Sequence, residues 1–505
     1  MIFNKKFSKL SRKKQFLKGI SSVFLQKILV RIIGVVITPI ILYYLSPQEY
    51  GIWILINSFL GYMGLLDFGI TGAVTTIIAK NDNDYTNHKY LLTIINNAFF
   101  LQLFIALFIM IIGFCFSFYF PKFFKIDKPE LSKIAIIVFN IAIISYGISF
   151  PLKALKGFLK GKQYIALVVW LEFIFFITTT LLNLFLLYEG WGLLSLSISS
   201  LIVRIISFFI IYFFIKKIFN YFNLNIKLIN RESLKDIFNV SIYWFIGMIA
   251  AVIIYSTDNI VIGSILSVSF VTIYALSYRL TEVIREFIYS INFTLMPGIG
   301  QLLGEKKIDR VKEIYLETQS FILVLALLSS LFIFLFNKDF ITLWVGEKFY
   351  GGEKLTLIFS LILFSSIIFH SSSIILSAAL KVKVVSFLRI LEALINIILS
   401  IILIKYLNLI GVSLATFISS LLTAFLIPYY AMKYLDISFN EYYMRVILKI
   451  FPIYLFLFIL VFILKNNDFN VIIRLIIFIV SSILSIFYIL KKEYKVKLLN
   501  ILQRK

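Results

Sequence analysis

Two cations lie inside a stretch that is otherwise built for hydrocarbon, QKILVRIIGVVITPIILYYL at residues 26–45. Lys27 and Arg31 are four residues apart, so a helix would place them on one face, one turn apart. An ionisable side chain deep in a bilayer costs on the order of 2.5–3.5 kcal/mol and normally faces a cavity or a partner. Lys27 is close enough to the start of the stretch to reach the interface, whereas Arg31, about 16 Å along the helix, is too deep to do so easily. The pair could therefore present positive charge to an anionic ligand.

A carboxylate on the next apolar stretch could instead neutralise Arg31. Asp67 lies in GYMGLLDFGITGA, in a stretch that would cross the membrane in the opposite direction, at nearly the depth of Arg31. The glycines around it would let helices approach closely. Two interpretations stay open and can coexist: an Arg31–Asp67 ion pair between adjacent helices, and an anionic ligand held by Arg31 and Lys27.

Four further charges lie within eight residues of YRLTEVIREF, residues 278–287. Arg279, Glu282 and Glu286 would follow one face of a helix, and Arg285 lies three residues beyond Glu282. Four charges in this space cannot all face lipid. They either neutralise one another or line a cavity, where a carboxylate could take part in proton or cation coupling.

Other charged residues have less certain surroundings by position alone. Arg204 lies deep in a predicted span and is a candidate for a cavity. Asp258, in STDN at the outer end of another span, either caps a helix, faces water or contributes to ion coupling. Glu172 and Glu392 lie near the inner ends of their spans and are expected to pair with nearby lysines, namely Lys160, Lys162, Lys381 or Lys383.

No motif for enzyme chemistry is found. The sequence contains no Cys/His cluster with metal-ligand spacing, no phosphate-binding glycine loop and no Ser and His arrangement for acyl transfer. We therefore expect no catalytic residue, no metal and no cofactor, with H⁺ or Na⁺ as the candidate coupling ion.

The elements that must position these charges are membrane-spanning helices. The chain has 505 residues, of which 61% are hydrophobic and only 15% charged. Apolar windows of roughly 18 to 28 residues recur along it, each long enough to cross a bilayer core of about 30 Å as a helix. An all-α polytopic membrane protein of about fourteen transmembrane helices is predicted, with spans near 20–45, 50–79, 91–120, 132–154, 163–187, 191–215, 238–257, 268–299, 313–336, 355–380, 386–404, 411–432, 445–464 and 470–490.

The charge distribution predicts the orientation. The net charge is +24, but the basic residues flank apolar spans and lack patterned aromatic interleaving, so nucleic acid is not expected as a partner. Lys and Arg concentrate on the connections that share a side with both termini, which predicts that both termini are cytoplasmic. The basic segment 1–19 precedes an apolar stretch too long for a cleaved signal peptide, so a retained first span is expected.

An internal repeat predicts the domain organisation. LKGKQYIALVVWLE at 159–172 aligns with LKVKVVSFLRILE at 380–392, and GLLSLSISS at 192–200 with GVSLATFISS at 411–420, at offsets of about 220 residues. Two parallel, pseudo-symmetric six-helix lobes around a central cavity are expected, which could open to either side by rocking. The predicted domains are a basic cytoplasmic N-terminus (1–19), the N-terminal lobe (20–215), a cytoplasmic linker (216–237), the C-terminal lobe (238–432), two additional transmembrane helices (433–490) and a basic cytoplasmic tail (491–505).

Two stretches carry a family resemblance. These are LSPQEYGIWILINSFLGYMGLLDFGITGAV at 45–74, with its Glu-Tyr-Gly and Asp-x-Gly elements, and STDNIVIGSILSVSFVTIYALSYRL at 256–280. The sequence resembles the polysaccharide or O-antigen (Wzx-type) flippases. They belong to the multidrug/oligosaccharidyl-lipid/polysaccharide exporter (MOP) superfamily, which also holds drug extruders and the lipid II flippase.

The resemblance implies a function. Such proteins translocate undecaprenyl-pyrophosphate-linked oligosaccharide from the cytoplasmic to the outer leaflet of a bacterial cytoplasmic (inner) membrane by alternating access. Membrane lipids and other polysaccharide-assembly proteins are the further partners to expect. Fixed cations would hold the pyrophosphate, with Arg31, Lys27, Arg204, Arg279 and Arg285 as candidates. The alternatives are a cation-coupled small-molecule or drug extruder of the same superfamily and a membrane-embedded polysaccharide polymerase or transferase.

Overall fold

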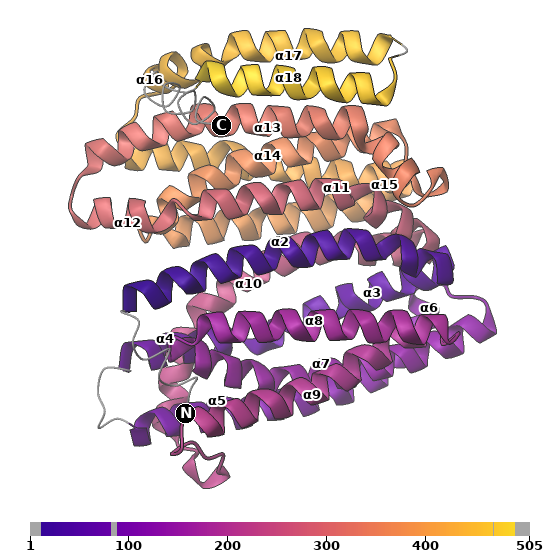
Figure 1. Cartoon of the computed structure of the whole chain (residues 1–505), viewed down its shortest axis with the longest axis vertical. Coiled ribbons are helices and arrows are strands. Elements are labelled where there is room, and N and C mark those ends of the chain that lie inside the picture. The colour runs from indigo at the N-terminus through magenta and orange to yellow at the C-terminus, as the bar shows by residue number, and fades with distance from the viewer. Residues whose placement is uncertain (1–11, 82–87, 468, 490–505) are drawn as a thin grey trace, which may run out of the picture. The chain divides into compact units, whose positions relative to one another are not determined.

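The computed structural model describes residues 12–81, 88–467 and 469–489, and over these ranges the chain consists of helices and short connections without a strand (Figure 1). The elements of the first half are α2 (Arg12–Tyr44), α3 (Pro47–Met63), the 3₁₀ turn η1 (Gly64–Asp67), α4 (Ile70–Asn81), α5 (His88–Ser117), α6 (Phe120–Phe123), α7 (Pro129–Gly161), α8 (Ile165–Tyr188), α9 (Leu194–Ile218), η3 (Ile226–Leu228) and α10 (Arg231–Ile265). Those of the second half are α11 (Val268–Phe293), α12 (Met296–Gly304), α13 (Ile308–Trp344), η4 (Glu347–Phe349), α14 (Glu353–Ala378), α15 (Val382–Tyr434), α16 (Phe439–Tyr442), η5 (Tyr443–Ile447), α17 (Leu448–Asn466) and α18 (Val471–Ile489).

The prediction of an all-α polytopic membrane protein is confirmed. The fourteen predicted spans fall on helical segments, although 50–79 and 268–299 each extend over two helices. The predicted span 50–79 is a broken one, in which the segments before and after residues 68–69 are bent by 44°. The spans 386–404 and 411–432 both lie on α15, which divides at Asn408, where φ is 51°.

The chain folds as two compact units, unit 1 (residues 1–272) and unit 2 (residues 273–505). Helix α10, which the sequence assigns to the second repeat, packs against α3, α4 and α5 of unit 1. The predicted domain boundaries were drawn from sequence repeats, whereas the two units are defined by how compactly the chain packs. The units therefore do not test those boundaries, which stay a prediction.

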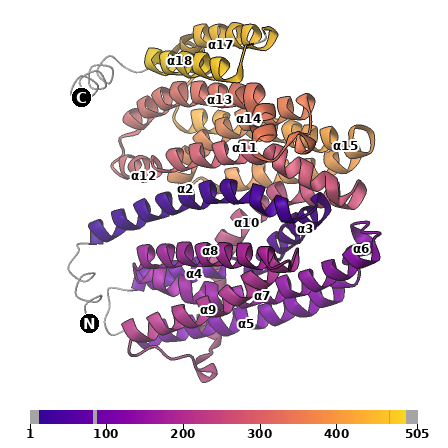
Figure 2. The same ribbon diagram turned by 45° about the vertical axis from the view of Figure 1, so that its right-hand side comes forward.

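Helix α7 is the central helix of unit 1 and lies beside α4, α5 and α9 (Figures 1 and 2). Two glycines let it approach α4. A Cβ on Gly157 would lie 3.1 Å from the carbonyl oxygen of Thr71, and one on Gly161 would lie 2.7 Å from Cβ of Ile78. Close approach through small residues four apart is a common way to pack membrane helices. Because both residue numbers rise together along the contact, α4 and α7 run in the same direction.

The connection between α9 and α10 is fixed to α5 by two buried asparagines. Asn96 donates to the carbonyl oxygen of Asn223 (2.9 Å) and accepts from the backbone N–H of Asn225 (2.6 Å). Asn97 accepts from the backbone N–H of Asn230 (3.1 Å). Burial of these amides is tolerated because the backbone satisfies their hydrogen bonds.

In unit 2, α17 and α18 form a pair that lies beside α13 (Figures 1 and 2). The Tyr454 hydroxyl donates to the carbonyl oxygen of Leu323 (2.9 Å). Arg474 of α18 forms an ion pair with Asp339 of α13 (3.1 Å). The two helices that lie outside the predicted repeat are therefore tied to unit 2 by polar as well as apolar contacts.

The close contact of α7 with α4 can be tested with two alanine substitutions. Gly161→Ala is expected to lower the free energy of unfolding by about 1–3 kcal/mol, since the new methyl group overpacks the contact. Gly298→Ala in α12 is the matched control because a Cβ there meets nothing within 4 Å, so the higher helix propensity of alanine should raise stability by up to about 1 kcal/mol. Unfolding in detergent micelles measures both, and shifts of the same sign would contradict the close approach.

Candidate functional site

A break between α3 and α4 positions Asp67. The chain leaves the helix at Phe68 (φ 47°) and Gly69 (φ 75°), directly after η1. The Asp67 side chain is 3% exposed, and its Oδ1 accepts from the Thr71 hydroxyl (2.9 Å) and from Nε2 of Gln102 on α5 (2.6 Å). A positive φ is easy for glycine and rare for phenylalanine. The break therefore places a buried carboxylate at the start of α4.

Two lysines of α7 lie close to this carboxylate. Gly157 lies against Thr71, and Lys153 and Asp67 each lie four residues before one of these two residues. The ammonium of Lys153 lies over the ring of Phe150, 4.3 Å from its centroid, and 5.3 Å from that of Tyr146. Lys153 interacts electrostatically with Asp67.

The second lysine connects α7 to α8. Lys156 Nζ lies 3.0 Å from Oε1 of Glu172. Arg204 of α9 lies within electrostatic range of Glu172 and of both lysines. We call this set, Asp67, Lys153, Lys156, Glu172 and Arg204, the unit-1 charge cluster.

The cluster has one positive charge in excess, because it holds three cations and two carboxylates. Glu172 neutralises Lys156, and Oδ1 of Asp67 accepts from two neutral donors. Within the described part of the chain, neither the ammonium of Lys153 nor the guanidinium of Arg204 forms a hydrogen bond or an ion pair. Cations at membrane depth without a counter-ion are costly. The arrangement is therefore suited to an anionic ligand.

The predicted pairing of Arg31 with Asp67 is wrong. Helix α2, which carries the exposed Lys27 and the half-buried Arg31, packs against α8. The break after Asp67 turns its carboxylate toward Gln102 of α5 instead. Arg31 and Lys27 as ligand contacts stay a prediction.

The charges of α11 partly neutralise one another. Arg279 pairs with Glu282 at 2.8 Å, and Glu286 is half-buried. Arg285 is 6% exposed, donates to the Tyr278 hydroxyl (2.6 Å) and lies over its ring at 5.6 Å. These four residues lie in unit 2, and their ligand and coupling roles stay predictions.

The remaining predicted residues have varied surroundings. Asp258 of α10 is 8% exposed and interacts electrostatically with Tyr62, which is hydrogen-bonded to Thr257. Glu392 accepts from Arg389 one turn earlier (2.9 Å) and from Thr423 (2.8 Å). Neither glutamate pairs with the predicted lysines. Glu392 pairs with Arg389, one turn away on the same helix, and Glu172 pairs with Lys156 of the facing helix α7.

Sequence reasoning missed Lys153, Lys156, Thr71 and Gln102. A signal for the lysines is present in the sequence. They are three residues apart, hence on one face, and the next turn carries the small residues Gly157 and Gly161 that bring α7 onto α4. No comparable sequence signal marks Gln102.

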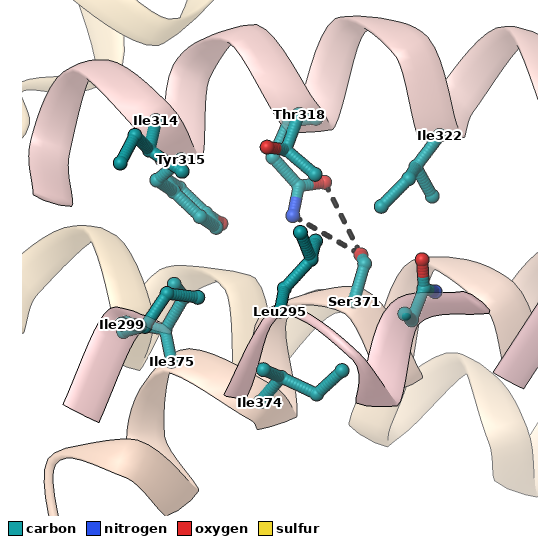
Figure 3. Close-up of a pocket in the computed structure, with 11 residues that line it drawn as sticks. Leu295, Ile299, Ile314, Tyr315, Thr318, Ile322, Ser371, Ile374 and Ile375 are labelled. Carbon is teal, nitrogen blue, oxygen red and sulfur yellow. Dashed lines mark hydrogen bonds between the residues drawn. The ribbon is translucent and has the colours of Figure 1, made fainter. Parts of the chain in front are cut away.

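A second group of buried polar side chains lies in unit 2 (Figure 3). Nε2 of Gln319 donates to the Ser371 hydroxyl (3.1 Å). The Tyr315 and Ser372 hydroxyls are also hydrogen-bonded (3.0 Å). Leucine and isoleucine side chains line the small pocket beside them, which has room for about one water molecule. These groups are neutral, so this pocket is less suited to an anion than the unit-1 charge cluster. Among the described residues, no three His, Cys, Asp or Glu side chains gather as a metal site would require.

Two family models match the chain. The family described as "Polysaccharide biosynthesis protein" matches residues 16–303, more than half of the chain, and the MatE family matches residues 244–402. No curated protein matches the chain.

Solved structures of similar fold also come from transport proteins. An inward-facing multidrug resistance MATE family transporter of the MOP superfamily aligns with a TM-score of 0.68 at 16% identity, covering 81% of this chain and 98% of that one. The lipid II flippase MurJ, in an inward closed conformation, aligns with a TM-score of 0.67 at 19% identity over 92% of this chain and 97% of that one. A MOP superfamily transporter from Pyrococcus furiosus, whose reversed binding-pocket polarity suggests a different function, gives 0.58 at 16% identity over 83% and 95%. These relatives are transporters and flippases, not enzymes.

The Lys156–Glu172 ion pair can be measured with a double-mutant cycle. Lys156→Gln and Glu172→Gln are each expected to lower the free energy of unfolding, and the double variant should lose less than their sum, with a coupling energy of about 0.5–3 kcal/mol. The control is the Lys465–Glu353 pair, whose side chains are 43% and 70% exposed and whose coupling should lie between about 0 and 1 kcal/mol. Denaturant titration in mixed micelles gives these values, and no coupling in the first pair would contradict the geometry described above.

Proposed function

The chain belongs to the polysaccharide biosynthesis protein family, and on this premise we propose that it is a flippase for undecaprenyl-pyrophosphate-linked oligosaccharide repeat units. It moves them from the cytoplasmic to the outer leaflet by alternating access, for the assembly of O-antigen, capsule or exopolysaccharide. The similarity of the fold to MATE transporters and to MurJ supports a transport protein of the MOP superfamily.

The observation that carries the substrate proposal is the excess positive charge of the unit-1 charge cluster. A pyrophosphate group is anionic, and in a region of low dielectric it needs fixed cations close to its oxygens. The planar guanidinium of Arg204 can bind two phosphate oxygens at once, whereas Lys153 offers a compact point charge. Both side chains have their charge available, whereas that of Lys156 is paired with Glu172.

A drug extruder would need a different charge pattern. A cationic drug is best received by carboxylates in excess of the cations, but the cluster holds only two carboxylates beside three cations, and Glu172 is paired with Lys156. The match to the MatE family over residues 244–402 keeps the cation-coupled extruder as the second candidate. The polymerase or transferase interpretation is disfavoured because the relatives are transporters.

The remaining assignments follow from this proposal. Lys27, Arg31, Arg279 and Arg285 are further head-group contacts, and Asp67, Glu282, Glu286 and Asp258 are the carboxylates available for coupling to H⁺ or Na⁺. The protein lies in a bacterial cytoplasmic (inner) membrane with both termini in the cytoplasm. Its partners are membrane lipids and other polysaccharide-assembly proteins.

The proposal is tested by the leaflet accessibility of a labelled undecaprenyl-pyrophosphate oligosaccharide in liposomes that contain the purified protein. Wild type is expected to move the lipid. Arg204→Gln and Arg31→Ala should each slow this movement about 10- to 100-fold, the loss expected when one charge-assisted contact of about 1.5–3 kcal/mol is removed. Arg310→Gln, at an exposed position of α13, should leave the rate unchanged.

Three results would contradict the flippase. The first is no movement of the lipid by wild type under any imposed H⁺ or Na⁺ gradient. The second is gradient-driven movement of a cationic dye in its place, which would favour the extruder. The third is the appearance of longer glycans, which would favour an enzyme.

A further inference from the structure

We propose that Gln102 and Thr71 withhold the carboxylate of Asp67 from Lys153, and that this keeps the Lys153 ammonium available as a binding site for phosphate oxygens. The inference rests on the proposed function for the identity of the anion. The withheld carboxylate itself is a property of unit 1 that can be measured without substrate.

Lys153 and Asp67 are placed where an ion pair would be expected. Each lies four residues before a member of the Gly157–Thr71 contact between α7 and α4, and their charges interact. The lysine side chain is long and flexible, and a buried carboxylate is its natural partner. The Lys153 ammonium lies over the rings of Phe150 and Tyr146 instead.

The donors on Asp67 explain why this pair does not form. Oδ1 of Asp67 already receives the Gln102 amide at 2.6 Å and the Thr71 hydroxyl at 2.9 Å, and these two donors also contact each other at 3.2 Å. Hydrogen bonds to a carboxylate stabilise its charge. Both bonds are made to Oδ1, so the gain from capturing the lysine at Oδ2 is reduced but not abolished.

Gln102 and Thr71 each direct their hydrogen bond to Asp67 in an unusual way. Gln102 is fully buried, and its Oε1 has no hydrogen-bond partner in the described part of the chain, so only the donor end of its amide is used. The hydroxyls of Thr75 and Thr76 bond to the backbone carbonyl four residues earlier, as is usual in helices. Thr71 bonds to the side chain of Asp67 because the chain is broken just before α4.

The consequence is the number of cations that a ligand can use. If Asp67 captured Lys153, then Lys153 and Lys156 would both be paired, and Arg204 alone would remain. With the carboxylate withheld, Lys153 and Arg204 are both available to one anion. Asp67 still offsets part of the positive charge, so the site can be empty without a bound counter-ion.

The test begins with Gln102→Leu, which removes the amide donor at similar volume. Freed of this donor, Asp67 is expected to pair with Lys153. Acylation of Lys153 by a small membrane-permeant amine reagent, followed by mass spectrometry, should then fall about tenfold, since pairing favours the protonated, unreactive amine. In the liposome assay, movement of the labelled lipid should fall by a similar factor.

The decisive variant is Gln102→Leu combined with Asp67→Asn, because no carboxylate is then left to capture the lysine. Lys153 acylation should return to within about twofold of wild type. The control is Gln319→Leu, which alters a buried glutamine in unit 2. It should change neither the acylation of Lys153 nor the rate of lipid movement. Thr71→Val, with its smaller expected effect of the same sign, serves if Gln102→Leu does not fold.

Unchanged acylation of Lys153 in folded Gln102→Leu would overturn the inference, as would failure of the double variant to recover. If the acylation pattern is as expected but wild type moves no lipid, the withheld carboxylate stands and the proposed substrate falls. If wild type moves the lipid but Gln102→Leu moves it equally well, the flippase stands and this inference falls.

Discussion

The contact of Gly157 and Gly161 with α4 sets the position of the charges in unit 1. Because two helices approach at backbone distance, a lysine one turn earlier on α7 is level with the carboxylate at the break after α3. A bulkier pair of residues would move α7 outward and separate Lys153 from Asp67. The electrostatics of the cluster therefore depend on a packing contact between residues that have no charge.

Charge in a membrane protein is informative because the surrounding hydrocarbon does not solvate it. In unit 2, Arg389 forms an ion pair with Glu392, and the Thr423 hydroxyl also donates to the Glu392 carboxylate. In unit 1, Lys156 and Glu172 do the same, but Lys153 and Arg204 have no such partner among the described residues. The first pattern is that of a structural ion pair, and the second is the one that our proposal assigns to an anionic ligand.

Sequence alone could predict the helices because a continuous apolar stretch has few other stable forms in a bilayer. It could also identify Asp67, which is buried, and Arg204, which is half-buried, as charges within the spans. It could not predict the rotation of each helix, which decides whether Asp67 faces α2 or α5, and so the Arg31–Asp67 pair was wrong. Lys153 and Lys156 were missed because lysines near the inner end of a span are usually interfacial, and Gln102 because a single glutamine in a helix carries no pattern.

The way Asn96 and Asn97 hold the connection between α9 and α10 bears on what keeps that part of the molecule together. The hydrogen bonds of these residues join α5 to the backbone on both sides of η3, and the buried Ile237 anchors the start of α10 in the core of unit 1. Covalent continuity between residues 219 and 230 is therefore not what retains α10. We therefore expect α10 to stay packed in unit 1 even if the backbone were cleaved within this connection.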